Sequence, residues 1–215
     1  MSPEPVTAER TYQRLKLDIM SGRFRPGALV VSQMVAEEFG TSISPVRDSM
    51  QRLVGERLLG HHEGGGFEIP AVTAEGLRDL HIWHGQVVRL AVKEGKPAAL
   101  PQNLLAGLEE LDPEDSYRIV QKTTDLFQQL GKASTNSEHG PTIAAISDRL
   151  FAFRLHEHGL KDRKAELIRI WNVIVSGQDS TAREVLWAYH RRRIRRVDTL
   201  LRAFYAAKGA QNQRL

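Results

Sequence analysis

The chain has 215 residues, of which 41% are hydrophobic, 26% charged and 7% aromatic, and it contains no cysteine. This composition fits one large or two small folded domains, and it argues against a disordered, collagen-like or disulfide-stabilised protein. Without cysteine, disulfides, thiolate metal sites and cysteine nucleophiles are excluded. No apolar run approaches the roughly 18 residues of a membrane span, and the N-terminal residues lack a signal-peptide pattern. We therefore expect a soluble, cytoplasmic protein.

The net charge of +4 and the isoelectric point of about 9.5 favour a nucleic-acid partner, but the surplus is unevenly placed. Residues 1–72 carry 8 Lys and Arg against 9 Asp and Glu, whereas residues 73–215 carry 22 against 17. Net charge therefore does not mark the N-terminal part as a DNA-binding region. If that part binds DNA, particular residues must do it.

The first two elements predicted in the chain are helices. Apolar residues at helical spacing indicate a helix over residues 7–21, and the glycine- and proline-containing segment 24–27 reads as a turn. Ser32 is the expected N-cap of a short second helix, which Gly40 ends.

A third helix and a hairpin follow. Ser44 is the expected N-cap of this helix, with Pro45 at its first position and an end near Leu58. Two short extended pieces around a glycine-rich tip predict a hairpin over residues 59–70. Two helices joined by a tight turn, with a hairpin behind them, are typical of a winged helix-turn-helix, so residues 1–72 are expected to form a DNA-binding domain of that type.

From Thr73 onward every periodic segment is helical, which predicts a mainly α protein whose second domain, residues 73–215, is an all-helical bundle of about six helices. The expected helices span residues 73–94, 98–111, 113–133, 141–157, 162–177 and 180–207.

Five polar side chains fall inside the apolar stripes of three of these helices: His84, Thr124, Gln128, His190 and Arg193. An unpaired buried polar group costs about 1–3 kcal/mol, so such groups either pair with one another or line a cavity. A shared pocket would bind a small molecule, and Arg193 would then be the natural partner of a carboxylate or phosphate. The alternative is an internal network with no ligand. His81, at the edge of its stripe, is expected to be an ordinary core residue.

Two further features lie beside these stripes. The run Arg191–Arg196 directs Arg193 inward, and its other arginines are expected to form a solvated helix face. Trp83 and Trp187 flank their stripes, where they can pack either at a dimer interface or in the core.

The N-terminal residues resemble the GntR family of bacterial transcription regulators. The segments that carry the resemblance are Ile19–Leu29 with its SGRxxPG turn, Val35–Gly40, Ser42–Asp48 with its PVR sequence, Gln51–Leu53 and the wing glycines Gly64–Gly66. The helical remainder resembles the FadR-like (FCD-type) C-terminal domain, which in that family binds a small effector and dimerises. The resemblance implies a homodimeric regulator of double-stranded operator DNA, most often a repressor, that responds to a small organic acid. The alternative is a dimeric regulator with no small-molecule effector.

The resemblance also implies which residues contact DNA. These are Gln33, Ser42, Ser44, Arg47, Gln51, Arg52, Gly65 and Gly66. The family usually carries an arginine where Ile43 stands in this chain, and arginine is the commonest reader of guanine in the major groove. Arg47 and Arg52 are the arginines that remain on the third helix.

Many FCD domains hold a metal ion with one Asp and three His, and this chain departs from that pattern. The corresponding positions are Thr124, Gln128, Leu167 or Ile168, and His190, so only the last can be a ligand. We expect no metal and no cofactor. Since the sequence contains no phosphate-binding loop and no nucleophile elbow, an enzymatic function is not expected either.

Overall fold

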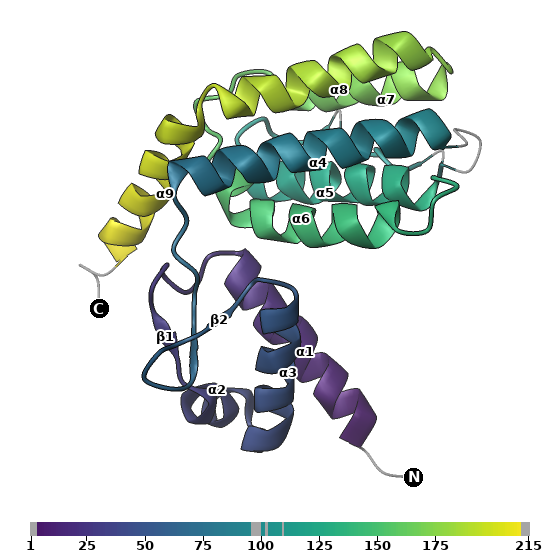
Figure 1. The fold of residues 1–215 in the computed structure, drawn as a ribbon. Helices are drawn as coiled ribbons and strands as arrows, with labels where there is room; N and C mark the ends of the chain where they lie inside the picture. The colour runs from purple at the N-terminus through teal and green to yellow at the C-terminus, as the bar shows by residue number, and fades with distance from the viewer. Residues whose placement is uncertain (1–3, 96–99, 102, 109, 212–215) are drawn as a thin grey trace. The chain divides into compact units, whose positions relative to one another are not determined.

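The computed structural model describes residues 4–95, 100–101, 103–108 and 110–211 (Figure 1). The chain divides into two compact units, Met1–Val72 and Thr73–Leu215. Both units are mainly helical. None of the helices in the described ranges is long and apolar enough to cross a membrane.

The first unit contains three helices and a small antiparallel sheet, in the arrangement of a winged helix-turn-helix. Its elements are α1 (Glu4–Met20), β1 (Leu29–Val30), α2 (Ser32–Phe39), α3 (Ile43–Gly55), β2 (Gly60–His61) and β3 (Phe67–Glu68). The strand order is β1-β3-β2, with Phe67 opposite both Val30 and His61. The hairpin of β2 and β3 is the predicted wing, whereas the pairing of β1 with β3 was not predicted.

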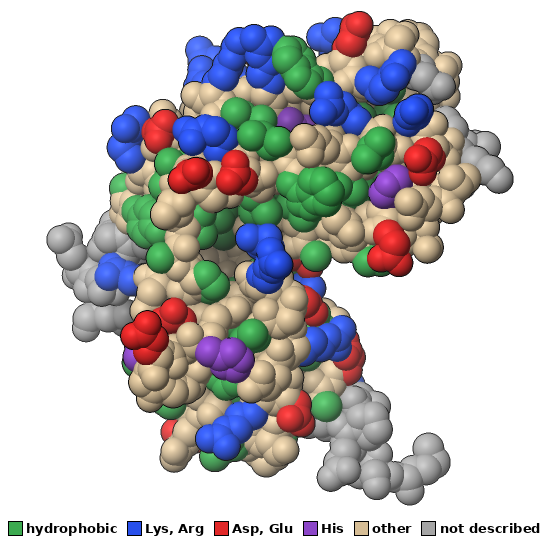
Figure 2. Space-filling view, in the orientation of Figure 1, with side chains coloured by type: hydrophobic (Ala, Val, Ile, Leu, Met, Phe, Trp, Pro, Cys, Tyr) green, Lys and Arg blue, Asp and Glu red, His purple; other side chains and the backbone are tan. Residues whose placement is uncertain are grey.

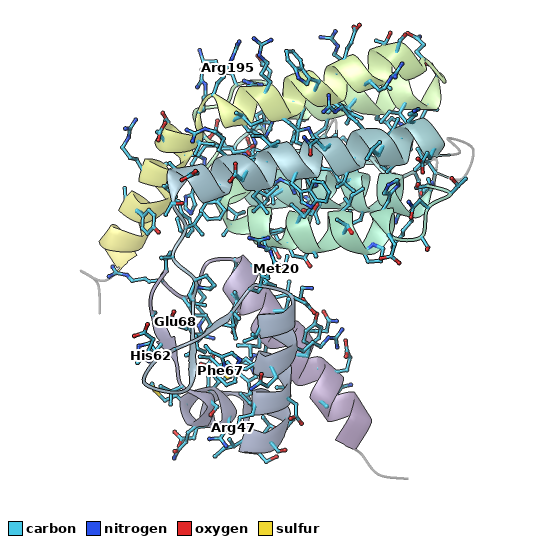
Figure 3. All side chains as sticks on the ribbon, in the orientation of Figure 1. Met20, Arg47, His62, Phe67, Glu68 and Arg195 are labelled. Carbon is cyan, nitrogen blue, oxygen red and sulfur yellow. The ribbon has the colours of Figure 1, made fainter. Side chains whose placement is uncertain are left out.

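The core of this unit forms where α1 and α3 pack together and the sheet closes over them. Leu15 from α1 and Val46 and Leu53 from α3 are fully buried. Phe67 extends from β3 toward α3 and is also buried (Figure 3). Apolar side chains from all three elements therefore fix the position of α3, whose opposite face stays in solvent.

The helix starts differ from the predicted ones by one or two residues. Val31 occupies the N-cap position of α2, so the prediction that Ser32 caps this helix is wrong. Ser42, not Ser44, is the N-cap residue of α3, which ends at Gly55 rather than near Leu58. Pro45 is then the third residue of α3, still in the first turn, where its missing N–H costs no hydrogen bond.

In its described residues, the second unit is a helical bundle, as predicted, and contains six helices whose boundaries differ from the predicted ones. They are α4 (Ala74–Glu94), α5 (Ser116–Lys132), α6 (His139–Leu155), α7 (Arg163–Val175), α8 (Asp179–Ile194) and α9 (Val197–Gln211). Helix α4 packs against α5, α6, α8 and α9. Its residues Leu77, Val88 and Ala91 are completely buried, which places α4 at the centre of the bundle.

The helix predicted at residues 98–111 is not present. Residues 98, 99, 102 and 109 lie outside the described residues, and the others in this range form turns and bends. Leu108 and Leu111 are buried and account for the apolar spacing that suggested a helix. Gly107, however, has a φ of 72°, a left-handed conformation that interrupts helical hydrogen bonding.

The single helix predicted at residues 180–207 is instead two helices, because the chain turns at Arg195 and Arg196 (Figure 3). Neither proline nor glycine causes this break. Beyond it, Val197 is fully buried, and the ring of Phe204 lies 4.6 Å from the ring of Phe153 on α6. A straight helix would carry these apolar side chains away from the bundle, so tertiary packing overrides local helical propensity at this point.

Helices α5 and α6 approach each other closely at Gly131. An added Cβ at this position would lie 3.0 Å from the Cα of Gly140 and 3.1 Å from the Cδ1 of Ile143. We predict that Gly131→Ala destabilises the second unit by about 1–3 kcal/mol through overpacking, more than the roughly 1 kcal/mol that alanine adds to a helix. Urea unfolding followed by circular dichroism measures this change.

Gly55→Ala is the matched control for that substitution. Gly55 is the last residue of α3, and nothing lies within 4 Å of a Cβ added there. We expect its free energy of unfolding to be unchanged or raised. If Gly131→Ala behaved in the same way, the close approach of α5 and α6 would not constrain the bundle.

Candidate DNA-binding surface and buried polar cluster

All the residues that the sequence assigns to DNA contact lie on the surface of the first unit. They are Gln33 on α2, Ser42 just before α3, Ser44, Arg47, Gln51 and Arg52 on α3, and Gly65 and Gly66 in the wing, and each is exposed. Exposure leaves their polar groups accessible to a nucleic acid. It does not by itself place them in one contact surface.

A groove of about 430 Å³ brings four of them together between α3 and the wing. Arg47 and Gln51, one helical turn apart on α3, form one side, and Gly65 and Gly66 form part of the other. Both glycines have φ near 90°, which a residue with a Cβ adopts only under strain, so the wing tip depends on them. Arg47 forms no hydrogen bond or ion pair with any described residue, which leaves its guanidinium available to a base or phosphate.

The same groove contains residues that sequence reasoning missed. Ser32, the first residue of α2, and His61 in β2 both line it. His61 also packs on the ring of Phe67, with 5.6 Å between the ring centroids. The pairing of β2 with β3 places His61 here, and only a correct strand register could have predicted this position.

Arg52 lies on a different flank of α3, facing α1. Its Nη1 is 3.1 Å from a carboxylate oxygen of Glu9, and its Nε is 3.5 Å from Glu56. Its guanidinium carbon also lies 3.5 Å from the centroid of the Tyr12 ring. Arg52 is thus paired within the protein, unlike Arg47, and a DNA contact by Arg52 stays a prediction.

In the second unit, polar side chains from four helices meet around the ring of Phe127 on α5. We call this group the buried polar cluster: His81 and His84 from α4, Thr124 from α5, Ser147 and Arg154 from α6, and Tyr189, His190 and Arg193 from α8. The ring centroids of His84, Tyr189 and His190 lie 4.8, 5.0 and 5.7 Å from that of Phe127. No member of the cluster is more than 7% exposed.

A directed chain of hydrogen bonds runs through the two histidines at its centre. His190 Nδ1 lies 2.7 Å from the carbonyl oxygen of Leu186, which only accepts, so Nδ1 carries the proton. His84 Nδ1 therefore donates to His190 Nε2 at 2.8 Å. The Ser147 hydroxyl then donates to His84 Nε2 at 3.0 Å. Every ring nitrogen of this pair is engaged.

Burial keeps these histidines neutral. It lowers the pKa of His190 to about 3, and the neighbouring Arg193 adds to this effect. Burial and the nearby Arg154 guanidinium hold the pKa of both His81 and His84 well below the usual value. All three imidazoles are consequently uncharged near neutral pH.

Arg193 is paired inside the protein. Its Nε and Nη2 each lie 2.9 Å from a carboxylate oxygen of Glu157, and its Nη1 lies 2.9 Å from Glu166. A further bond joins Nη1 to the carbonyl oxygen of Tyr189. Because these bonds occupy its donors, Arg193 could hold a ligand carboxylate only by giving one of them up.

Arg154, in contrast to Arg193, is unpaired, and it was not among the site residues predicted from the sequence. It is 1% exposed, and none of its three guanidinium nitrogens has a hydrogen-bond partner in the described part of the chain. Its guanidinium carbon lies 5.4 Å from the Phe127 centroid. A heptad-type spacing of seven residues puts Ser147 and Arg154 on one face of α6, so a helical wheel of the predicted helix 141–157 could have found this position.

Gln128 is only partly buried, although it follows Phe127 on α5. No described hydrogen bond or ring contact joins its side chain to the buried polar cluster. A role for Gln128 in effector binding stays a prediction.

Residues 7–69 match the model of the bacterial regulatory proteins of the gntR family, a range that spans all three helices and the wing of the first unit apart from the first residues of α1. The first unit is therefore a domain of the gntR family. The groove between α3 and the wing therefore belongs to a DNA-binding domain of the GntR type.

Several transcriptional regulators are similar to this chain. YdhC of Bacillus subtilis is 25% identical over 186 residues, which cover 84% of this chain and 76% of YdhC. McbR of Escherichia coli is 32% identical over 97 residues, 45% of this chain and 43% of McbR. A GntR regulator from Rhodococcus sp. RHA1 has the same fold, with a TM-score of 0.67 at 21% identity over 88% of this chain and 96% of the other. These relatives are regulators rather than enzymes.

The GntR-family resemblance raised the question of a metal ion, and the residues present do not fit one. Thr124, Gln128 and an apolar residue, Leu167 or Ile168, occupy three of the implied ligand positions, and both nitrogens of His190 are already used in hydrogen bonds. Within the described ranges, no three His, Asp or Glu side chains are grouped so that they could hold a metal.

The buried histidines predict a specific pH dependence of stability. Below pH 6.5 the unfolded chain binds protons at His81, His84 and His190 that the folded unit does not bind, so stability falls as the pH falls. Each histidine contributes about 1.4 kcal/mol per pH unit. All three tryptophans lie in this unit, so urea unfolding followed by tryptophan fluorescence at pH 7 and pH 5 measures its loss selectively.

Two variants check the assignment of that loss. His81→Phe removes one buried titrating group and is expected to reduce the pH dependence by about one proton. His158→Gln, which removes an exposed histidine of the same unit, is the matched variant for comparison. Equal slopes for the wild type and His81→Phe would contradict the assignment.

Proposed function

We propose that this GntR-family regulator is a repressor whose affinity for operator DNA is changed by a small acidic metabolite bound in its helical domain, residues 73–215. The observation that carries the proposal is the buried polar cluster, a set of polar side chains deep in a bundle that apolar residues would otherwise fill. Such a cluster lowers the stability of the fold unless its groups are fully hydrogen-bonded. A functional role explains why the chain tolerates this cost. Repression is the commoner mode in the family that the sequence resembles.

The DNA contact is assigned to the groove between α3 and the wing. Arg47 and Gln51 would read base edges or phosphates in the major groove, and the Gly65–Gly66 tip would approach the backbone or the minor groove. Gln33, Ser42 and Ser44 are exposed and would supply phosphate contacts.

A homodimer would present two such grooves to a short palindromic site. The face of the helical domain formed by α4 and α8 is the proposed interface. Ile82, Trp83 and Leu90 on α4 and Trp187 on α8 are between 39% and 51% exposed, and apolar side chains gather on this face in Figure 2. Aromatic residues are enriched in the centres of protein–protein interfaces.

Effector binding would shift the population between conformations of the dimer that differ in DNA affinity. The coupling is reciprocal, so operator DNA would change effector affinity by the same factor. The second candidate function is a dimeric regulator without an effector. The closed hydrogen-bond chain of Ser147, His84 and His190 favours this alternative, because that part of the cluster needs no ligand.

We predict that Arg47→Ala weakens binding to operator DNA by about 1–3 kcal/mol, that is, roughly 5- to 150-fold. The reason is the loss of an arginine that no described residue holds. Fluorescence anisotropy with DNA from upstream of the gene, at two salt concentrations and with scrambled duplex as competitor, measures the change.

Arg10→Ala is the control for that variant, since it removes the same charge from an exposed position on α1. It should bind operator DNA about as well as the wild type does. Equal losses in the two variants would show that total charge, rather than the groove, determines binding. If the wild type bound a genome-wide fragment pool no better than scrambled duplex, the assignment of the groove would fail.

The proposed interface gives a separate prediction. Trp83→Lys introduces a charge at its centre and is expected to convert a dimer to a monomer in sedimentation velocity experiments. Val175→Lys, on an equally exposed apolar residue at the end of α7, should leave the dimer intact. A dimer that survives Trp83→Lys would place the interface elsewhere.

A further inference from the structure

The exposed side of α3 carries one large apolar side chain. Among the residues of α3, all of which the structure describes, the exposed ones are Ile43, Ser44, Arg47, Asp48, Gln51, Arg52 and Gly55. Ile43 is 40% exposed, whereas the apolar residues by which α3 packs into the domain, Val46, Met50 and Leu53, are fully buried. Ile43 is thus not part of the core of the first unit.

Ile43 lies on the same side of α3 as the two residues that line the groove. Arg47 follows it by four residues and Gln51 by eight, so the three side chains stand one turn apart. At a rise of about 1.5 Å per residue, the row is about 12 Å long, the height of three to four stacked base pairs. The row is therefore long enough to contact neighbouring base pairs.

Ile43 also lies at the end of α3 that a recognition helix directs at the bases. In helix-turn-helix proteins, the N-terminal residues of the second helix contact base edges in the major groove. Side chains of a helix tilt toward its N-terminus, so the side chain of the first residue extends past the helix start. Ser42, which precedes Ile43, makes no side-chain capping hydrogen bond, and its hydroxyl stays available to a phosphate.

The chemistry of isoleucine selects the base that it can recognise. Its side chain has no donor or acceptor, so it cannot bond to the polar groups of a base edge. Thymine is the base that presents an apolar group, its 5-methyl, in the major groove. Contact between that methyl and Ile43 removes apolar surface of both from water. Cytosine instead presents its amino group there, which Ile43 would cover without a hydrogen bond.

We propose that Ile43 is a specificity-determining residue that contacts the 5-methyl group of a thymine in the major groove of each operator half-site. The four-residue step from Ile43 to Arg47 is about 6 Å along the helix, so this thymine lies within about two base pairs of the group that Arg47 contacts. The inference rests on the proposed DNA contact of the groove, and it adds an apolar contact to the hydrogen bonds assigned there to Arg47 and Gln51.

The first experiment identifies the thymine with the full-length protein. Duplexes that bind the protein are selected from a random pool, and each thymine of the selected site is replaced singly by deoxyuridine. Deoxyuridine pairs with adenine as thymine does and lacks only the methyl group. We expect one thymine in each half-site to be sensitive, with wild-type affinity reduced about fourfold in fluorescence anisotropy, as for the loss of one buried methyl group.

Two substitutions of Ile43 assign the sensitive thymine to this residue. Ile43→Ala removes the side chain beyond Cβ, so the ratio of thymine to deoxyuridine affinity at that position should fall to about one. Ile43→Val keeps a branched apolar side chain and should preserve most of the ratio. The ratio compares two duplexes with the same protein, so a change in folding stability affects both measurements equally.

Leu17→Ala is the matched control. Leu17 is an apolar residue of α1 in the same unit and is 53% exposed. We expect its substitution to leave the ratio at the sensitive thymine at the wild-type value. If no thymine is sensitive in the wild type, or if the sensitivity persists in Ile43→Ala, the inference is overturned.

The same measurements separate this inference from the proposed function. If Arg47→Ala weakens binding to the selected sequence but no thymine depends on Ile43, the groove assignment stands and the inference fails. If one thymine depends on Ile43 while Arg47→Ala binds as the wild type does, the inference stands and the assignment of Arg47 fails. If the wild type selects no sequence from the pool, both fail.

Discussion

The need to balance buried charge determines how the helical domain is built. Arg154, Arg163 and Arg193 are each at most 7% exposed, in a region where an isolated charge is very costly. Glu157 and Glu166 offset two of these charges, and Glu157 contacts both Arg163 and Arg193. These ion pairs connect α8 to α7 and to the segment that follows α6. Charge pairing therefore holds the helices in register together with the apolar core around α4. Neither glutamate pairs with Arg154.

In the DNA-binding domain, the side chains assigned to DNA contact are exposed to solvent, so their charges carry no cost of burial. Three of its arginines are paired internally: Arg14 with Glu38, Arg23 with Asp18 and Glu38, and Arg52 with Glu9. These internal pairs explain why the net charge of residues 1–72 does not mark the domain as a DNA-binding one. What distinguishes Arg47 is its position in the groove and the lack of a competing carboxylate among the described residues.

Helical periodicity and turn residues predicted the winged helix-turn-helix, the all-helical second domain and the burial of His84, Thr124, His190 and Arg193, but not all of the helix boundaries. It failed where tertiary contacts decide the outcome. The turns at Gly107 and Arg195 depend on packing against other helices, which a wheel cannot represent. The same limit applies to the candidate site, because whether an arginine is paired depends on neighbours distant in sequence. Arg193 therefore appeared to be the free cation, whereas its partners Glu157 and Glu166 lie 36 and 27 residues away.

The run Arg191–Arg196 also contains arginines that bind groups within the protein. The expectation that Arg192 and Arg196 only form a solvated face was incomplete, since they donate to the carbonyl oxygens of Lys161 and Gly159 at 2.6 and 2.9 Å. Arg193 holds Glu157 in the same segment between α6 and α7. This segment begins just after Arg154, whose own carbonyl oxygen accepts a hydrogen bond from Arg163. These hydrogen bonds tie the junction of α8 and α9 to the segment that follows α6.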